Sequence, residues 1–493
     1  MRALVIALLA ACGGPQNASH PADQPPEVAA YPALRWAPDA PTYLVSAHTV
    51  KDGQRAIRDA IDSFGMLALA TPADVSAAMQ AALGVDPLGP DLGAKLGVDL
   101  DGGVAVFSEG LSPTLVVHLA APAATRAFFA RLPALGVAPT IATVEGVEIA
   151  TARLHRGPLA SWAIDGDWLW LHLAFHDELP SAPSTAWFTH PHHAATPTWR
   201  EGFAWAAKLA SHAGPIVGLW NNRAVLATIA ALMRADAQAK EAVACVTALE
   251  VVDRVGFAID GDGSHVGGRL ALDVGPAAPK IAAAILPPPP GFAALAAAAP
   301  LAGQWNLDVD AMASGLAPCL AAMGLDPSEL TSKGIRAARG VLETFDPDSR
   351  SGTGAIAFDL SSKTVAEQLL DQIPHRSLLE SDRTFGAYRG KHIGIPMVLS
   401  VDYVLDDKLA LAAMGDGLLA QLVSGTAPAN PPLFAFDVRT APLADGTWTW
   451  LCAHFIGRGG GELASLLLHW RDAHIALSIE HGALVLDASG NRR

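Results

Sequence analysis

The sequence is poor in charged residues, and acidic residues outnumber basic ones. Only 16% of its 493 residues are charged, against about 25% in typical soluble domains. With 33 basic and 48 acidic residues, the formal net charge is −15. Surfaces that bind nucleic acid or anionic lipid headgroups need clustered Lys and Arg. The composition therefore predicts no nucleic-acid partner.

Long apolar runs and familiar catalytic motifs are also missing. After the first twelve residues, no segment gives the ~18 consecutive apolar residues that would predict a spanning helix. The chain has no phosphate-binding loop of the Gly-x-x-x-x-Gly-Lys type, no His-Glu-x-x-His zinc helix and no Gly-x-Ser-x-Gly nucleophile motif. These absences favour a protein that is not an enzyme and predict no cofactor. A hydrolase with an unfamiliar site is the alternative.

Cysteine is scarce: the chain has four, at positions 12, 245, 319 and 452. No Cys-x-x-Cys pair occurs. If Cys12 is modified, three thiols remain, and an odd number cannot pair completely. Two interpretations stay open for Cys245, Cys319 and Cys452: one disulfide in an oxidising compartment, or small buried apolar side chains.

The first residues have the layout of a secretory signal. Arg2 supplies a positive charge, residues 3–9 are apolar, and small residues precede Cys12. This apolar run of about ten residues is too short to span a membrane, which takes roughly 20. We therefore predict that residues 1–11 are a signal peptide that is removed.

The segment Leu9-Ala10-Ala11-Cys12 resembles the lipobox of bacterial lipoproteins. The resemblance implies that the Cys12 thiol receives a diacylglyceryl group and that the signal is cut just before it. Two or three acyl chains would anchor the chain firmly, because each buried methylene contributes ~0.8 kcal/mol. Gly13, rather than Asp, follows the cysteine, as in lipoproteins that are sent to the outer membrane. The outer membrane is therefore the expected location, in preference to the inner one. Residues 12–34 are mainly polar and proline-rich and are predicted to be a flexible tether.

The remaining chain contains a weak internal repeat. Four short segments recur in the same order at an offset of 240 or 241: 84–87 with 324–327, 114–119 with 354–359, 132–133 with 373–374, and 167–171 with 407–411. A polyproline stretch at 287–291 separates the two copies and is predicted to be a linker. We therefore expect two related domains in tandem, at 35–286 and 292–493.

Within each half, strand-like and helix-like patterns alternate. Apolar residues at Ile57, Ile61 and Phe64 share one helix face, and residues 123–132, 221–249 and 365–373 are also predicted to be helical. Asp165-Gly166 between 161–164 and 168–173 is typical of a tight hairpin, because glycine accepts a positive φ. Further hairpins are expected around Asp260-Gly261 and His481-Gly482. The pattern predicts an α+β fold in which each domain has a mostly antiparallel sheet with packed helices.

Histidines form the one cluster of metal-ligating type. His172 and His176 share a face of a predicted strand and its exit, and a proline-rich loop follows that contains His190, His192 and His193. Imidazoles and nearby carboxylates in one loop are ligands for zinc or copper. A solvated loop is the competing interpretation, because a metal site needs fixed geometry.

Two further patterns have a structural and a functional interpretation. Seven tryptophans lie between 162 and 220, and Trp168 and Trp170 would share one face of a strand whose other face carries Leu169 and Leu171. Such a strand is either buried between layers or lines an apolar groove for lipid, peptide or glycan. The aspartates in 346–352 resemble a calcium loop, but Arg350 and Ala357 stand where oxygen ligands are required, which favours a polar turn.

Together these features resemble large tandem-domain bacterial lipoproteins of unassigned function. The expected role is a membrane-anchored binding or scaffold protein of the cell envelope, with an apolar ligand or an envelope protein as its partner. A periplasmic metal-binding protein and an envelope hydrolase are the alternatives.

Overall fold

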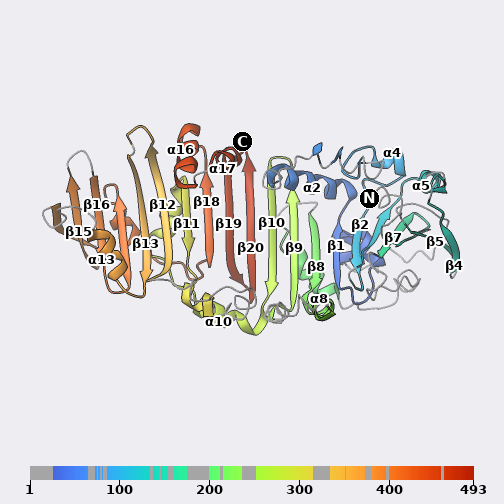
Figure 1. Ribbon diagram of the computed structural model, residues 1–493, viewed down its shortest axis with the longest axis horizontal. Coiled ribbons are helices and arrows are strands. Elements are labelled where there is room, and N and C mark those ends of the chain that lie inside the picture. The colour runs from blue at the N-terminus through green and yellow to red at the C-terminus, as the bar shows by residue number, and fades with distance from the viewer. Residues whose placement is uncertain are drawn as a thin grey trace. The chain divides into compact units, whose positions relative to one another are not determined.

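The fold is α+β, and its strands pair antiparallel throughout the described residues. A computed structural model describes residues 26–64, 73–74, 76–77, 80, 86–110, 112–133, 137–144, 146–153, 159–174, 199–210, 215–235, 251–314, 334–349, 351–371, 379–395, 399–456 and 460–493. These residues divide into two compact units (Figure 1). Unit 1 lies within Met1–Ala235 and Val252–Leu272, and unit 2 contains Asp273–Arg493. Among the described residues, no helix is long and apolar enough to cross a membrane.

Unit 1 is built on ten strands: β1 (Tyr43–Ala47), β2 (Val104–Ser108), β3 (Thr114–His118), β4 (Thr140–Val144), β5 (Val147–Arg153), β6 (Leu159–Asp165), β7 (Trp168–Ala174), β8 (Ile216–Asn221), β9 (Arg254–Gly261) and β10 (His265–Asp273). Their order in the sheet is β4-β5-β6-β7-β3-β2-β1-β8-β9-β10. The helices are α1 (Pro26–Ala30), η3 (Pro32–Trp36), α2 (Val50–Phe64), α4 (Leu92–Leu96), α5 (Pro122–Phe129), α7 (Trp199–Ala207) and α8 (Asn222–Ala235).

Unit 2 also has ten strands: β11 (Leu301–Trp305), β12 (Ile335–Asp346), β13 (Ser351–Leu360), β14 (Glu380–Phe385), β15 (Tyr388–Ile395), β16 (Leu399–Leu405), β17 (Leu409–Met414), β18 (Phe434–Arg439), β19 (Trp470–Glu480) and β20 (Ala483–Arg492). Their order is β14-β15-β16-β17-β13-β12-β11-β18-β19-β20. The helices are η8 (Gly275–Ala277), α10 (Ala278–Ala283), α11 (Phe292–Ala298), α13 (Thr364–Asp371), α15 (Leu418–Leu422), α16 (Asp445–Ile456) and α17 (Gly460–Leu468).

Adding ten to each strand number of unit 1 gives the strand order of unit 2. The registers of the last three strands agree as well. Ile259 lies opposite Ile216, and Leu477 lies opposite Phe434, so that each pair in unit 2 is 218 residues beyond its counterpart (477 − 259 and 434 − 216). Each position in these strands of unit 1 therefore has a counterpart in unit 2.

Local signals explain where several elements begin and end. Thr49 caps α2, because its hydroxyl oxygen accepts a hydrogen bond from the Asp52 backbone N–H at 3.0 Å. Gly166, with φ 59°, closes the β6–β7 hairpin. His481 and Gly482, with φ 50° and 83°, close the β19–β20 hairpin in the way a two-residue turn requires. These hairpins lie where the sequence predicts them.

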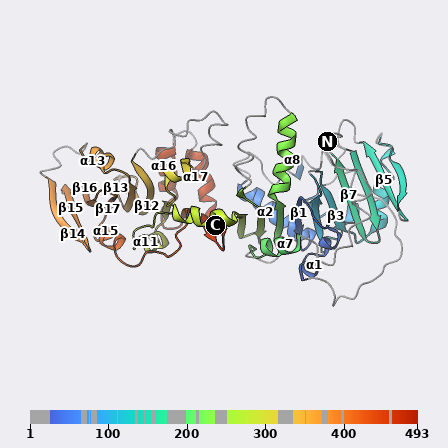
Figure 2. The ribbon, with the colours of Figure 1, turned by 90° about the horizontal axis from the view of Figure 1, so that it is seen from below.

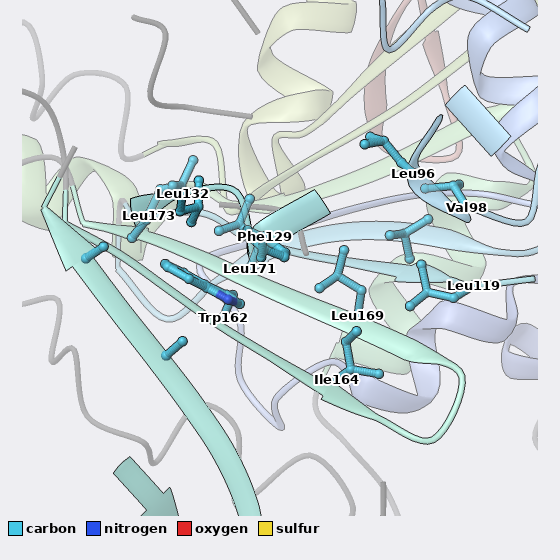
Figure 3. Close-up of a cluster of buried hydrophobic side chains, with 14 of the residues drawn as sticks. Leu96, Val98, Leu119, Phe129, Leu132, Trp162, Ile164, Leu169, Leu171 and Leu173 are labelled. Atoms are coloured by element: carbon cyan, nitrogen blue, oxygen red, sulfur yellow. The ribbon is translucent and has the colours of Figure 1, made fainter. Parts of the chain in front are cut away.

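The core of unit 1 lies between the sheet and helices α4 and α5. Trp162, Leu169 and Leu171 are at most 2% exposed and point into this cluster (Figure 3). The ring of Phe129 on α5 stacks on Trp162 at 4.9 Å with an interplanar angle of 8°. On the opposite sheet face, Trp170 packs edge-on against Trp36 of η3 at 5.0 Å. Strands β4–β7 form the end of the unit 1 sheet that we call the wing. Within the wing, β7 therefore has an apolar layer on both of its faces.

In unit 2, α11 and α15 lie on one side of the strands and α13, α16 and α17 on the other (Figure 2). The main core lies on the first side and contains Ala302, Ala355, Leu411 and Leu419. The polyproline stretch 287–291, predicted to be a linker between domains, lies inside unit 2. Pro288 and Pro289 are buried, and the Gly291 N–H donates to the Leu422 carbonyl at 2.9 Å. The stretch is thus packed onto α15.

Candidate functional site

Most of the predicted functional residues lie outside the described part of the chain. This applies to the lipidation site Cys12, to four of the five clustered histidines (His176, His190, His192 and His193) and to Cys245 and Cys319. Cys452 is a buried free thiol, and burial raises its pKa. In the ranges that the structure describes, no three His, Cys, Asp or Glu side chains are grouped to hold a metal ion.

His172, the remaining member of the predicted cluster, is buried in unit 1. It is 6% exposed, and its Nδ1 lies 2.9 Å from the Thr114 hydroxyl on the neighbouring strand. Burial lowers the pKa of His172 to about 4, because the charged imidazolium loses its hydration. At neutral pH the ring is therefore uncharged and belongs to a polar row across the sheet. That row continues through Ser161, Thr151 and Thr140 on β6, β5 and β4.

The tryptophan strand is buried on both faces. All seven residues of β7 are buried, with Trp168 and Trp170 on one face and Leu169 and Leu171 on the other. Of the two interpretations for this strand, the structure supports burial between layers. The aspartate-rich segment is a polar turn between β12 and β13: Asp346 accepts hydrogen bonds from the Asp348 N–H at 3.0 Å and the Ser349 hydroxyl at 2.6 Å.

Among the described residues, three histidines lie within 3.0 Å of a carboxylate, which the sequence did not reveal. His118 lies between Asp99 and Asp167, at 2.8 and 3.0 Å. His392 contacts Asp402 at 2.8 Å, and His474 contacts Asp437 at 2.7 Å. Within the described ranges, none of these three imidazoles hydrogen-bonds a hydroxyl group. The pairs link neighbouring strands and loops.

The most unusual surface lies in unit 2, on the sheet face opposite the main core. A set of directly opposed residues crosses six strands here, and we call it the open row: Phe436, Gly303, Gly340, Ile356, Ala412 and Tyr403. Ile356 is 45% exposed and Phe436 is 37% exposed. Met414, on the same face of β17, is 40% exposed. Exposed apolar side chains gathered on one face are typical of a binding surface.

Two adjacent glycines form the floor of the open row. A Cβ added at Gly303 would lie 3.5 Å from the Phe436 ring, and one at Gly340 would lie 3.7 Å from the Ile356 side chain. Both are ordinary van der Waals distances, and neither glycine has a positive φ. The described structure would therefore accept alanine at both positions. Glycine inside a strand weakens it and often marks a place where a ligand approaches the backbone.

Apolar side chains enclose the two glycines along the strand direction. On one side, Leu301 and Leu342 pack with Val438 and Trp448 in a cluster under α16 and α17. On the other side, Trp305 and Phe434 meet edge-on at 6.2 Å. Phe436 and Ile356 stand three strand spacings apart, about 14 Å. The resulting surface is apolar, and the exposed Phe436 and Ile356 flank the two glycines across the strands.

The sequence does not reveal this surface, because the strand segments beneath it, such as residues 354–358 of β13, are apolar on both faces. In the middle of β13, the buried residues are the small Ala355 and Ala357, while the larger Ile356 faces outward. The sequence identifies the buried face of a strand only when apolar and polar residues alternate along it. The two glycines were the available signal, but glycine also marks bulges and bends.

Comparisons with known proteins give little guidance. No family model matches the chain, and no curated protein matches it. Two solved structures of TP0453, in crystal forms III and I, match with TM-scores of 0.28 and 0.27 and identities of 9% and 10%. Each alignment covers 50% of this chain and 80% of the TP0453 chain. Similarity at this level supports no inference about function.

Proposed function

We propose that the protein is a lipid-anchored envelope protein that binds the acyl chain of a lipid on the open row of unit 2. The exposure of Ile356 and Phe436 beside the two glycines is the observation that carries this proposal. Covering apolar surface yields ~25 cal/mol per Å², and a floor without side chains lets a slender chain lie against the backbone. The binding role is non-enzymatic.

The anchor is the second part of the proposal. Cys12, in its lipobox-like setting, would carry the acyl groups and hold the protein at the outer membrane. Cys12→Ser is expected to move the protein from the membrane fraction to the soluble fraction and to remove the lipid mass. Mass spectrometry of the mature N-terminus tests this: an unmodified Cys12, or a chain that begins elsewhere, would refute the anchor.

Ligand binding is tested by titrating the purified protein with a dansyl-labelled fatty acid and following energy transfer from tryptophan. Ile356→Asp places a charge in the open row and is expected to weaken binding roughly tenfold or more, equivalent to at least ~1.4 kcal/mol. The matched control is Ile57→Asp, which puts the same charge on an isoleucine of α2 that is 40% exposed in unit 1. Equal affinities for the two variants would place the ligand elsewhere.

We further propose that the two units arose by tandem duplication. Three observations support this: the equal strand order, the constant offset of 218 residues in β8–β10 and β18–β20, and the offset of 241 residues that the strand registers give for β3/β13 and β7/β17, one more than in the sequence matches. The difference between the two offsets reflects the lengths of the connections between these strands, which vary easily because a longer loop costs little entropy.

A further inference from the structure

Strand β4 ends the sheet of unit 1 without the features that normally protect such an edge. In the part of the chain that the structure describes, β4 pairs with β5 alone. Its five residues, Thr-Ile-Ala-Thr-Val, include no charge, and Ile141 is 65% exposed. An edge strand presents unpaired backbone N–H and C=O groups, and proteins usually block it with charges or bulges.

The strand at the corresponding end of unit 2 is protected in this way. Three of the six residues of β14 are charged: Glu380, Asp382 and Arg383. Asp382 and Arg383 are exposed, so an approaching strand would have to desolvate them. The contrast is informative because the two strands hold the same place in the same strand order. One edge is closed to strand addition by its side chains, and the other is not.

The two faces of β4 continue the two layers of the wing. Ile141 lies opposite Ala150, which in turn lies opposite the buried Trp162, so this face extends the apolar core. Thr140 lies opposite Thr151, whose hydroxyl is 3.0 Å from that of Ser161, so the other face extends the polar row. A strand that adds to β4 must therefore alternate in the same way.

We propose that β4 pairs antiparallel with β4 of a second copy of this chain. With Ala142 on the two-fold axis, Ile141 of each copy faces Thr143 of the other, and the side chains of each face remain on that face. A copy of the same strand is uncharged, so opposed residues do not repel each other. The pairing satisfies the backbone groups that β4 leaves exposed.

The length of β4 sets the strength expected of this dimer. Five paired residues bury less than the ~1,000 Å² that a stable interface needs, so the dimer should be weak in dilute solution. Anchoring on one membrane raises the effective concentration of the copies and favours the pairing. The net charge of −15 opposes association at low ionic strength, so salt should strengthen the dimer by screening.

A single engineered cysteine tests the proposal. Ala142→Cys lies on the proposed two-fold axis, so a short bismaleimide should link two copies of the full chain, both on lipid vesicles and in concentrated solution. Asp382→Cys on β14 is the matched control, and the parent chain reports the background from its own cysteines. Cross-linking of Ala142→Cys at no more than the level of these controls would overturn the proposal.

A second substitution distinguishes strand pairing from random encounter. Adding Thr143→Lys to Ala142→Cys opposes lysine to the partner's Ile141 and should reduce cross-linking by roughly tenfold. Cross-linking that persists undiminished in this double variant would also overturn the proposal, because contact would then not depend on β4. The measurement in concentrated solution does not need Cys12, so it stays informative if the membrane anchor is refuted.

Discussion

The same row of the sheet is more deeply buried in unit 1 than in unit 2. The counterpart of the open row consists of Gly218, Val45, Val106, Leu115, Leu171 and Trp162, which we call the closed row. Leu171 and Trp162 are at most 2% exposed there. Val45 and Val106 stand where the open row has Gly303 and Gly340, and Val45 packs against the cluster of Ala47 and Ala56 beneath α2.

The comparison separates what fixes the fold from what fixes the surface. Both units keep the strand order although the closed row has Val45 and Val106 where the open row has the two glycines Gly303 and Gly340. The strand order therefore does not require this face to be filled. Unit 2 obtains its core from the other face, where Ala355, Ala413 and Leu411 pack against α11 and α15.

The sharpest test of this contrast truncates one side chain in each row. Trp162→Ala removes a fully buried ring that stacks on Phe129 and should lower the free energy of unfolding by about 3–5 kcal/mol. Ile356→Ala removes a half-exposed side chain and should cost less than about 1 kcal/mol. Urea denaturation, with hydrogen exchange on β6 and β13 to assign each transition, measures both. Equal losses would mean that the open row is core.

Acid should weaken unit 1 selectively, because His172 is neutral when folded. Its pKa falls from 6.5 to about 4 on burial, so below pH 6.5 the unfolded chain binds a proton that the folded chain does not. Unit 1 should thus lose up to about 3 kcal/mol between pH 6.5 and pH 4. His172→Gln should remove most of this dependence in urea denaturation at both pH values, leaving the part due to His48, whose pKa is also lowered by burial. An unchanged slope in His172→Gln would assign the effect to other groups.

In unit 2, the protonation of His474 has the opposite effect on stability: acid strengthens the fold. Its hydrogen bond to Asp437 raises its pKa above 6.5, so the stabilisation is complete below pH 6.5 and is lost as the pH rises through the folded value. His474→Gln should therefore be most destabilising at acid pH, with a difference that shrinks toward alkaline pH. A difference that grows with pH would contradict the assigned direction.

The smallest expected effect comes from filling the floor of the open row. Gly303→Ala and Gly340→Ala should each raise the free energy of unfolding by about 0.5–1 kcal/mol, because alanine loses less backbone entropy on folding. Gly218→Ala, in the closed row, should be destabilising, since its Cβ would lie 2.1 Å from the Phe257 ring. Thermal melts of the three variants test the opposite signs. A loss of stability in both Gly303→Ala and Gly340→Ala would show that something already occupies the floor.

Local elements could be predicted where a short sequence pattern determines the backbone conformation, as glycine does in the two hairpins. The helix at 50–64 and the hairpins at Gly166 and Gly482 lie where the sequence places them, but Ile57, on the predicted apolar face of this helix, is 40% exposed. The sequence could not show which face of an apolar strand becomes core, because Ala355 and Ile356 both count as apolar. It also could not show that Pro288 and Pro289 are packed, since their burial depends on α15, which lies more than a hundred residues away.

The strand order has a kinetic consequence. Strands β4, β5, β6 and β7 form a meander in which each strand pairs with the next, so their contacts close only short loops. The link to the rest of the sheet is the pairing of β7 with β3, where Thr114 meets His172, 58 residues away. Since local contacts form before distant ones, we expect the meander to assemble early during refolding and the β3–β7 pairing to be the slower, rate-setting event.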